Sequence, residues 1–273
     1  MASDRQELLV DRLDRVVRSV IVPALAVGLA AFQLYTAVTS PLVAMKQRVV
    51  HLALIAVLIM LMRPDRSRRW SRYFDYIVAI AALFPAIYML LNYEAIVLRS
   101  GIVLPADRWM GIVLIAVVLV VTKRVMGWPL VIISAIALLY ALYGNYIPGA
   151  FGHRGYSINR LVSHLYLTTE GILGVPLGAS ATFIYLFVFL GVLMEKTKTG
   201  DTFIQTAYAL TGRFRGGPAM TSVLASALFG TLNGSAAANV VTTGTFTIPL
   251  MKRTGYSAKV AGAVEAAASA GGQ

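Results

Sequence analysis

Residues 215–255 read RGGPAMTSVLASALFGTLNGSAAANVVTTGTFTIPLMKRTG, an apolar stretch with basic residues at both ends and the interruption NGSAAAN in its middle. Its length suits about one and a half crossings of a hydrocarbon layer roughly 30 Å thick. It therefore predicts a re-entrant helical hairpin (218–251): Pro218 to Leu232 enters the membrane, Asn233 to Asn239 turns at mid-depth, and Val240 to Met251 leaves on the same side. Because irregular backbone at that depth must be buried by protein or line a cavity, the hairpin marks a binding site.

The rest of the chain consists largely of further apolar runs. Of its 273 residues, 58% are hydrophobic and 13% are charged, a balance that a water-soluble core cannot accommodate. The runs are continuously apolar and do not alternate with period two, which favours helices over a closed barrel. The predicted fold class is all-α, a polytopic integral membrane protein of about six transmembrane helices plus the hairpin. The predicted crossings are Val20–Val38, Val49–Met62, Tyr76–Leu91, Trp109–Val121, Pro129–Tyr143 and Leu177–Met194.

The basic residues predict the orientation. With the N-terminus in the cytoplasm, only six of the 24 lysines and arginines fall outside: Lys46, Arg48, Arg99, Arg108, Arg154 and Arg160. The net charge of +12 therefore indicates membrane topology and not a nucleic-acid surface. Residues 1–18, MASDRQELLVDRLDRVVR, place leucine and valine against arginine and aspartate at helical spacing, which predicts an amphipathic helix on the cytoplasmic surface.

Small residues and neutral oxygen donors are concentrated in and after the interruption. Sodium in transporters is coordinated by unwound backbone carbonyls, and hydroxyl and amide oxygens suit the same hard ion, so we expect a sodium site beside Ser235, Asn239 and Thr243. A half-helix that begins near Asn239 would offer free N–H groups and a positive dipole end to a carboxylate. In the alternative interpretation, the small residues only let helices approach closely, and the hydroxyls bond to the preceding turn.

A further helix is expected from Ala258 to Ala268, with Ser257 as its N-cap, followed by a second ion-binding turn at Ser269–Gln273. Glu265 lies inside this apolar helix. An intramembrane carboxylate is costly and therefore a functional hypothesis: it can contact substrate or relay a proton. Pairing with a lysine or arginine of a neighbouring helix is the alternative.

Other chemistries find no support in the sequence. There is no cysteine and the three histidines are dispersed, so no zinc, iron–sulfur or disulfide framework is predicted. The spans contain no paired aspartates, no HExxH and no serine–histidine arrangement, which argues against an intramembrane enzyme.

The segment FGTLNGSAAANVVTTGTFTIPLMKRTGYSAKVAGAVEAAASAGGQ, which ends at Gln273, resembles the large-subunit signature of tripartite ATP-independent periplasmic (TRAP) transporters. The signature covers about Gly216 to Gln273; over the first 145 residues the likeness is one of hydropathy and arrangement only. It is most similar to fused permeases of the TAXI subgroup, in which a small four-helix subunit precedes a large twelve-helix subunit. The resemblance implies an amphipathic helix at 1–18, a small-subunit-like four-helix bundle at 19–125, a joining helix and periplasmic connection at 126–175, and the start of the large-subunit transport unit at 176–273.

This resemblance implies a multi-pass inner-membrane permease, bacterial or archaeal, for sodium-driven import of an organic anion, a carboxylate. A TAXI-type periplasmic binding protein would deliver the anion, and sodium would be the coupling ion, with no cofactor, no other metal and no nucleic acid. The implied ion-binding residues are Gly230, Ser235, Asn239, Thr243, Ser269, Gly271 and Gly272. The predicted substrate-binding residues are Asn233, Gly234, Ser235 and Glu265.

The family motif normally continues past Gly272-Gln273, and a second hairpin follows it. The chain is therefore expected to be a truncated permease. Two alternatives stay open: a non-tripartite carrier or channel with the same hairpin, and a membrane scaffold without transport activity.

Overall fold

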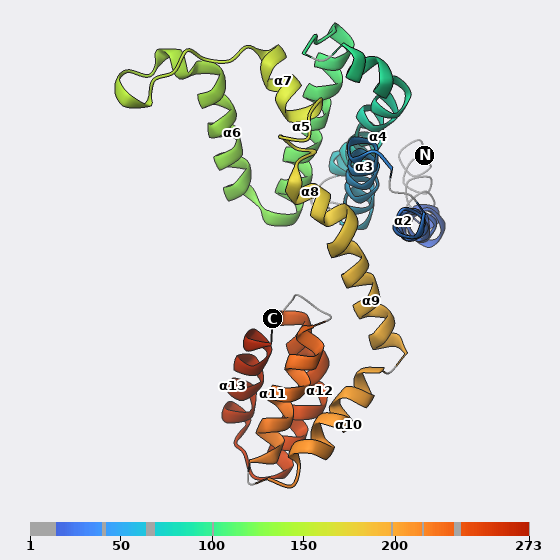
Figure 1. The fold of residues 1–273 in the computed structure, drawn as a ribbon, viewed down its shortest axis with the longest axis vertical. Helices are drawn as coiled ribbons and strands as arrows, with labels where there is room; N and C mark the ends of the chain where they lie inside the picture. The colour runs from blue at the N-terminus through green and yellow to red at the C-terminus, as the bar shows by residue number, and fades with distance from the viewer. Residues whose placement is uncertain are drawn as a thin grey trace, which may run out of the picture. The chain divides into compact units, whose positions relative to one another are not determined.

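The computed structural model describes residues 15–39, 42–63, 69–99, 101–197, 199–214, 216–231 and 236–272, which are helical or in turns and loops with no strand among them. The chain divides into two compact units, Met1–Thr182 and Phe183–Gln273 (Figure 1). Each unit has its own interior. The predicted all-α class is confirmed.

Six helices of the described residues are long and apolar enough to cross a membrane: Val17–Val38, Ala44–Met62, Ser71–Leu98, Pro105–Met126, Trp128–Tyr146 and Val175–Leu193. They confirm the six predicted crossings. Several extend well beyond the predicted runs, because polar and charged residues continue the helix past its apolar centre. Residues 1–14 of the predicted surface helix lie outside the described residues.

The first unit contains the helices up to Ala179. They are η1 (Val17–Ile21), α2 (Val22–Val38), α3 (Ala44–Met62), α4 (Arg69–Leu98), α5 (Pro105–Met126), α6 (Trp128–Tyr143), η2 (Gly144–Tyr146), η3 (Gly149–Phe151), α7 (Ile158–Tyr166) and α8 (Val175–Ala179). A π-helical segment, η4 (Ser180–Ile184), follows α8 and runs into the second unit.

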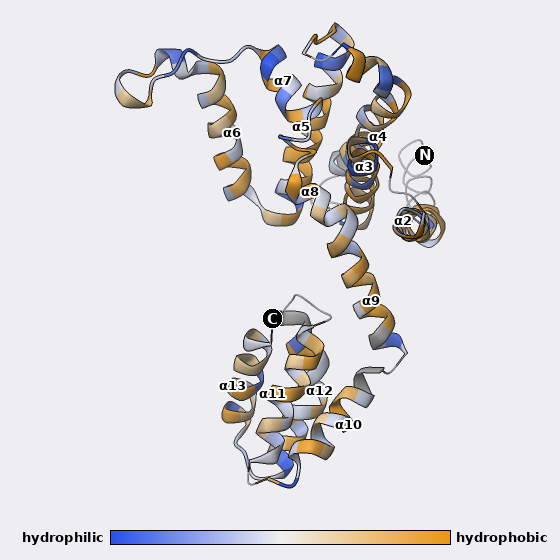
Figure 2. Cartoon of the chain, viewed as in Figure 1, coloured by the Kyte–Doolittle hydropathy of each residue, from blue (hydrophilic) through white to orange (hydrophobic). Residues whose placement is uncertain are grey.

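The interior of the first unit lies where α3, α4, α5 and α7 meet. Met60 and Met89 are fully buried there, and Tyr166 of α7 donates a hydrogen bond to the carbonyl oxygen of Pro85 at 2.6 Å. By contrast, α6 has no buried residue although most of its ribbon is coloured as hydrophobic in Figure 2, and most of its large apolar side chains are exposed, as expected of a helix that faces lipid.

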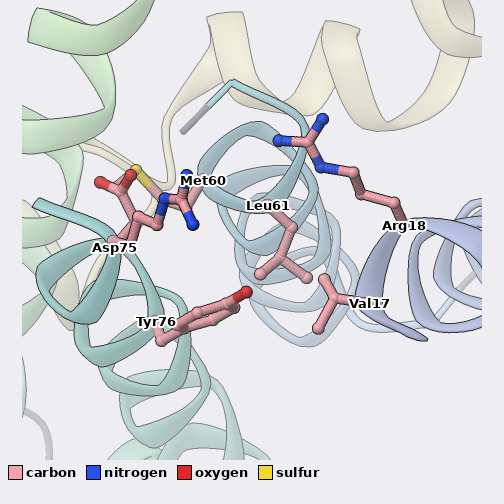
Figure 3. A pocket seen from close by; sticks show the side chains of 7 residues that line it. Val17, Arg18, Met60, Leu61, Asp75 and Tyr76 are labelled. Atoms are coloured by element: carbon pink, nitrogen blue, oxygen red, sulfur yellow. The ribbon is translucent and has the colours of Figure 1, made fainter. Parts of the chain in front are cut away.

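Among the described residues, ion pairs link α5 to α4 near one end and to Arg99, the residue directly after α4, near the other. Arg99 lies 2.8 Å from Asp107, and Arg124 pairs with Asp75. Arg124 also donates to the carbonyl oxygen of Arg63 at 3.2 Å, so these two arginines, both predicted to be cytoplasmic, lie at one end of the bundle. A small pocket at this end is shown in Figure 3. It is lined by Val17, Arg18, Met60, Leu61, Arg72, Asp75 and Tyr76.

The second unit contains α9 (Tyr185–Lys196), α10 (Thr199–Thr211), α11 (Gly217–Gly230), α12 (Ala236–Arg253) and α13 (Ala258–Gly271). The last three run up, down and up beside one another, so the C-terminal ends of α11 and α13 lie at the same end as the N-terminus of α12 (Figure 1). Helix α10 packs on α11. The rings of Phe203 and Phe229 meet there edge to face, with 5.7 Å between the ring centroids.

Helices α11 and α12 lie in the two segments predicted as the limbs of the hairpin, with shifted bounds. The turn was predicted to last until Asn239, but α12 already begins at Ala236, because the alanines before Asn239 favour helix. The turn predicted at Ser269–Gln273 was placed too early as well, because α13 stays helical until Gly271. At 14 residues, α11 is about 21 Å long, well short of a hydrocarbon layer of roughly 30 Å.

Candidate ion-binding site

The three helices α11, α12 and α13 enclose a polar interior. Each presents residues four positions apart, which places them on one face of the helix. All seven side chains have 0% exposure: Ser222 and Ser226 on α11, Asn239, Thr243 and Thr247 on α12, and Glu265 and Ser269 on α13. A helical repeat of four in this part of the sequence therefore builds one continuous polar cluster, which we call the hydroxyl cluster.

Glu265 lies at the centre of the hydroxyl cluster. Its Oε1 accepts hydrogen bonds from Thr243 and, at 3.2 Å, from Ser269. Its Oε2 accepts from Thr247 and, at 2.7 Å, from Ser222. Within the described part of the chain no lysine, arginine or histidine lies within 4.0 Å of the carboxylate, and the ion pairs present there are those of the first unit. Both oxygens of Glu265 therefore accept from hydroxyl groups. The predicted alternative, pairing with a lysine or arginine, is not observed among the described residues.

Gly244 allows the carboxylate to approach α12. A Cβ at this position would lie 3.2 Å from Glu265 Cγ. Such a distance is tighter than ordinary van der Waals contact, so the glycine leaves the room that Glu265 occupies.

Asn239 carries a buried oxygen without a partner. Its Nδ2 donates to the carbonyl oxygen of Ser226 at 3.0 Å. A carbonyl only accepts, so the amide nitrogen must face it and Oδ1 must face the other way. Among the buried side-chain atoms of the described residues, Asn239 Oδ1 has no hydrogen-bond partner. An unsatisfied buried acceptor costs about 1–3 kcal/mol, and such an atom in a native protein calls for an explanation, for example an ion or a water molecule.

Ser226 connects Asn239 to the hydroxyls around Glu265. Its Oγ lies 3.5 Å from the Thr243 hydroxyl and 3.4 Å from the Ser269 hydroxyl, while its carbonyl oxygen holds Asn239. Oxygen atoms from three helices therefore converge here. Neutral hydroxyl and amide oxygens of this kind suit a hard monovalent cation, whereas no group of three His, Cys, Asp or Glu side chains suited to a transition metal occurs in the described ranges.

The helix ends next to the hydroxyl cluster meet through glycine backbone. A Cβ on Gly230 would lie 1.5 Å from the carbonyl oxygen of Gly272, and a Cβ on Gly272 would lie 2.5 Å from that of Ser226. Only glycine permits such contacts. A Cβ on Gly271 would meet nothing within 4 Å, so the third predicted glycine is not part of this contact.

The predicted site residues thus divide into three groups. Asn239, Thr243, Ser269 and Glu265 lie within the cluster, and Gly230 and Gly272 meet beside it. Gly271 lies outside this contact, because a Cβ at its position would meet no neighbouring atom within 4 Å. The predicted residues Asn233, Gly234 and Ser235 lie outside the described residues.

Three residues of the cluster were missed as site residues. Ser222, Ser226 and Thr247 are ordinary helix residues in sequence. Their spacing of four, repeated opposite Glu265 and Ser269, is the signal that could have identified them.

The fold and the cluster define a class: an all-helical, polytopic membrane protein with a buried polar centre among helices that follow its crossings. Residues 113–273 match the family model described as "Tripartite ATP-independent periplasmic transporter, DctM component". The match covers more than half of the chain, and the chain belongs to this family. The resemblance seen in the segment that ends at Gln273 is confirmed at this level.

Curated relatives share shorter segments. The chain is 37% identical over 81 residues to the "C4-dicarboxylate TRAP transporter large permease protein DctM" of Vibrio cholerae, covering 30% of this chain and 18% of the relative. It is 28% identical over 132 residues to the protein y4mL of Sinorhizobium fredii, covering 48% of this chain and 26% of the relative. It is 34% identical over 86 residues to YgiK of Salmonella typhimurium, covering 32% and 20%. The aligned segments thus span about a quarter or less of these relatives. No solved structure matches the chain significantly.

Proposed function

We propose that this chain is part of the permease of a TRAP transporter that imports an organic anion, a carboxylate, together with sodium. Family membership supports transport, and the printed name of the Vibrio cholerae relative supports a carboxylate substrate. The proposal includes a periplasmic binding protein of the TAXI type as partner, a fused small and large subunit, and an inner-membrane location with a cytoplasmic N-terminus.

The observation that carries the sodium site is the unpartnered Oδ1 of Asn239. A bound sodium ion would satisfy this oxygen. Its further ligands in this proposal are the hydroxyls of Thr243 and Ser269, which lie 3.5 and 3.4 Å from the Ser226 hydroxyl, and Ser226 itself. The C-terminal ends of α11 and α13 lie at the same end of the bundle (Figure 1), and helix C-termini favour positive charge. Charge and ligand type thus support a cation at one place.

The carboxylate would bind at the N-terminus of α12, at the same end of the bundle. Free N–H groups and the positive end of the helix dipole favour an anion there. Asn233, Gly234 and Ser235 precede this helix directly in sequence. The hairpin would then hold cation and anion side by side.

Asn239→Ala tests the sodium site in the full-length permease, reconstituted with its periplasmic binding protein. Removing the amide leaves the other oxygens in place, so half-saturation of uptake should need at least about tenfold more sodium, equivalent to roughly 1.4 kcal/mol of lost binding. Asn92→Ala is the matched control, because the Asn92 amide donates to the Tyr88 carbonyl oxygen within its own helix α4 and belongs to the first unit. Unchanged sodium dependence in Asn239→Ala would remove the assignment. Uptake without the binding protein would favour a non-tripartite carrier or channel.

The re-entrant course of α11 and α12 has its own test. The 273 residues contain no cysteine, so single cysteines can be placed at Met220, which is 49% exposed near the start of α11, and at Lys252 near the end of α12. A re-entrant hairpin predicts that an impermeant thiol reagent labels both from the same side of the membrane. Ile102 precedes the crossing helix α5 and Met126 is its last residue. As a control, cysteines at these two positions should label from opposite sides of the membrane. Opposite labelling of the hairpin positions would make it a plain crossing.

A further inference from the structure

Glu265 has no partner that neutralises it among the described residues. The side chain is fully buried, and only hydroxyl groups approach its two oxygens. Desolvating a carboxylate is costly, and hydroxyl dipoles offset the cost without cancelling the charge. A buried charge of this kind becomes favourable when a positive charge binds nearby.

The protons around Glu265 can be assigned. An ionised carboxylate only accepts hydrogen bonds, and each hydroxyl has one proton to give. Thr243 also lies 2.9 Å from the backbone carbonyl oxygen of Asn239, but a charged oxygen is the stronger acceptor, so Thr243 and Ser269, which both approach Oε1, direct their protons at Glu265. Their lone pairs are then directed away from the carboxylate, and both groups can only accept on that side.

Ser226 lies on the accepting side of these two hydroxyls. Its Oγ is 3.4 Å from Ser269 and 3.5 Å from Thr243, so it must donate to one of them. Asn239 lies beside these hydroxyls: its amide nitrogen bonds to the Ser226 carbonyl oxygen at 3.0 Å, and its own backbone carbonyl oxygen is 2.9 Å from the Thr243 hydroxyl. The orientation of the Thr243, Ser269 and Ser226 hydroxyls thus depends on the charge on Glu265.

The geometry points to Glu265 as a positioning residue for the cation: its charge turns the hydroxyls of Thr243 and Ser269 into acceptors for the ion, and the bound ion compensates that charge across them. Glu265 itself stays out of contact with the ion, because four hydroxyls fill its oxygens. The inference rests on the proposed sodium site and names the group that prepares it.

Sodium-dependent thermal stabilisation of the full-length permease in detergent tests this role without substrate or binding protein. Sodium chloride is titrated against choline chloride at constant ionic strength, and the melting temperature is followed, since a ligand that binds only the folded state raises it. For Glu265→Gln we expect half-saturation to need at least about tenfold more sodium. In sodium-free medium its melting temperature should equal or exceed that of the wild type, because the variant no longer buries a charge.

A merely structural role predicts the reverse pattern. Glu265→Gln would then melt at a lower temperature in sodium-free medium and would keep the wild-type sodium dependence. Glu265→Asp retains the charge on a shorter side chain and should recover part of the sodium response. Glu94→Gln, which removes an exposed carboxylate from α4, should change neither quantity.

The outcomes separate the two proposals. If the wild type shows no sodium response, the sodium site fails, and the role of Glu265 fails with it. If the wild type responds and Glu265→Gln responds equally, only the positioning role is overturned. Should Glu265→Gln fail to fold, Thr247→Val decides: it removes one of the donors that offset the charge at Oε2, so the ion has more charge to compensate, and half-saturation should need about threefold less sodium. An unchanged value would overturn the inference.

Discussion

The interiors of the two units of this chain are built from different side chains. In the first unit, α3, α4 and α5 meet through methionine, valine and alanine, and the buried carboxylates of Asp75 and Asp107 lie near the helix ends, each with an arginine. In the second unit, α11, α12 and α13 meet through hydroxyls, an amide and the carboxylate of Glu265, which lies midway along α13. No arginine or lysine among the described residues pairs with this carboxylate.

The contrast is between satisfied and unsatisfied polar groups, not between apolar and polar interiors. The first unit also buries polar side chains between α2, α3 and η4, where His51 contacts Gln33 and lies 3.0 Å from the Ser180 hydroxyl. Those groups have partners within the unit. The second unit leaves one oxygen of Asn239 unpartnered and one carboxylate without a counter-charge. A self-contained interior holds a fold together, whereas an interior short of positive charge is suited to receive an ion.

The largest effect is expected from Gly230→Ala, which disrupts the backbone contact between Gly230 and Gly272 beside the hydroxyl cluster of the second unit. Its Cβ would lie 1.5 Å from the Gly272 carbonyl oxygen, and backbone cannot rotate away as a side chain can. Helices α11 and α13 must separate, so we expect loss of sodium-dependent stabilisation and of uptake in the full-length permease. The melting temperature should fall by the equivalent of about 3 kcal/mol, in the range of severe overpacking.

Gly271→Ala provides the matched control for that variant. Gly271 is the last residue of α13, next to Gly272, and its Cβ would meet nothing within 4 Å. We expect melting temperature and sodium dependence close to wild type. Equal effects of the two substitutions would show that the glycines act through helix propensity and not through the contact between the two backbones.

The sequence allowed much of the fold and part of the site to be predicted. Continuous apolar runs identified all six crossings, since hydrophobic length is a property of the local sequence. The signature around Asn239 identified the family, and Asn239, Thr243, Ser269 and Glu265 do lie in one cluster. Helix limits were less predictable, because alanines after the NGS segment extend α12 across residues expected to form a turn.

The remaining part depends on contacts between helices that the sequence does not encode locally. Ser222 and Thr247 become notable only because Glu265 of a third helix lies between them. Whether Glu265 pairs with a base or with hydroxyls could likewise be decided only by knowing its neighbours. The ion pairs of α4 with α5 were missed for the same reason, since Arg99 appeared only as a marker of topology.

A smaller effect, confined to stability, is expected from Asp107→Asn in the first unit. Asp107 is fully buried; it accepts from Tyr88 at 2.7 Å and from the Leu104 backbone at 2.8 Å, and it pairs with Arg99, whose side chain is 19% exposed. The substitution leaves the Arg99 charge without its partner, which costs about 3 kcal/mol at a fully buried pair and less here, where Arg99 retains some solvent. The melting temperature of the full-length permease should fall in sodium-free medium.

Sodium half-saturation should stay unchanged in Asp107→Asn, because the ion pair belongs to the interior that is complete in itself. Adding Arg99→Gln should restore much of the lost stability, since the uncompensated charge is then gone. The expected result is thus the converse of Glu265→Gln, in which sodium dependence changes and the sodium-free melting temperature does not fall. If Asp107→Asn also shifted sodium half-saturation tenfold, the two interiors would be energetically coupled, and a division into one self-contained and one ion-dependent unit would fail.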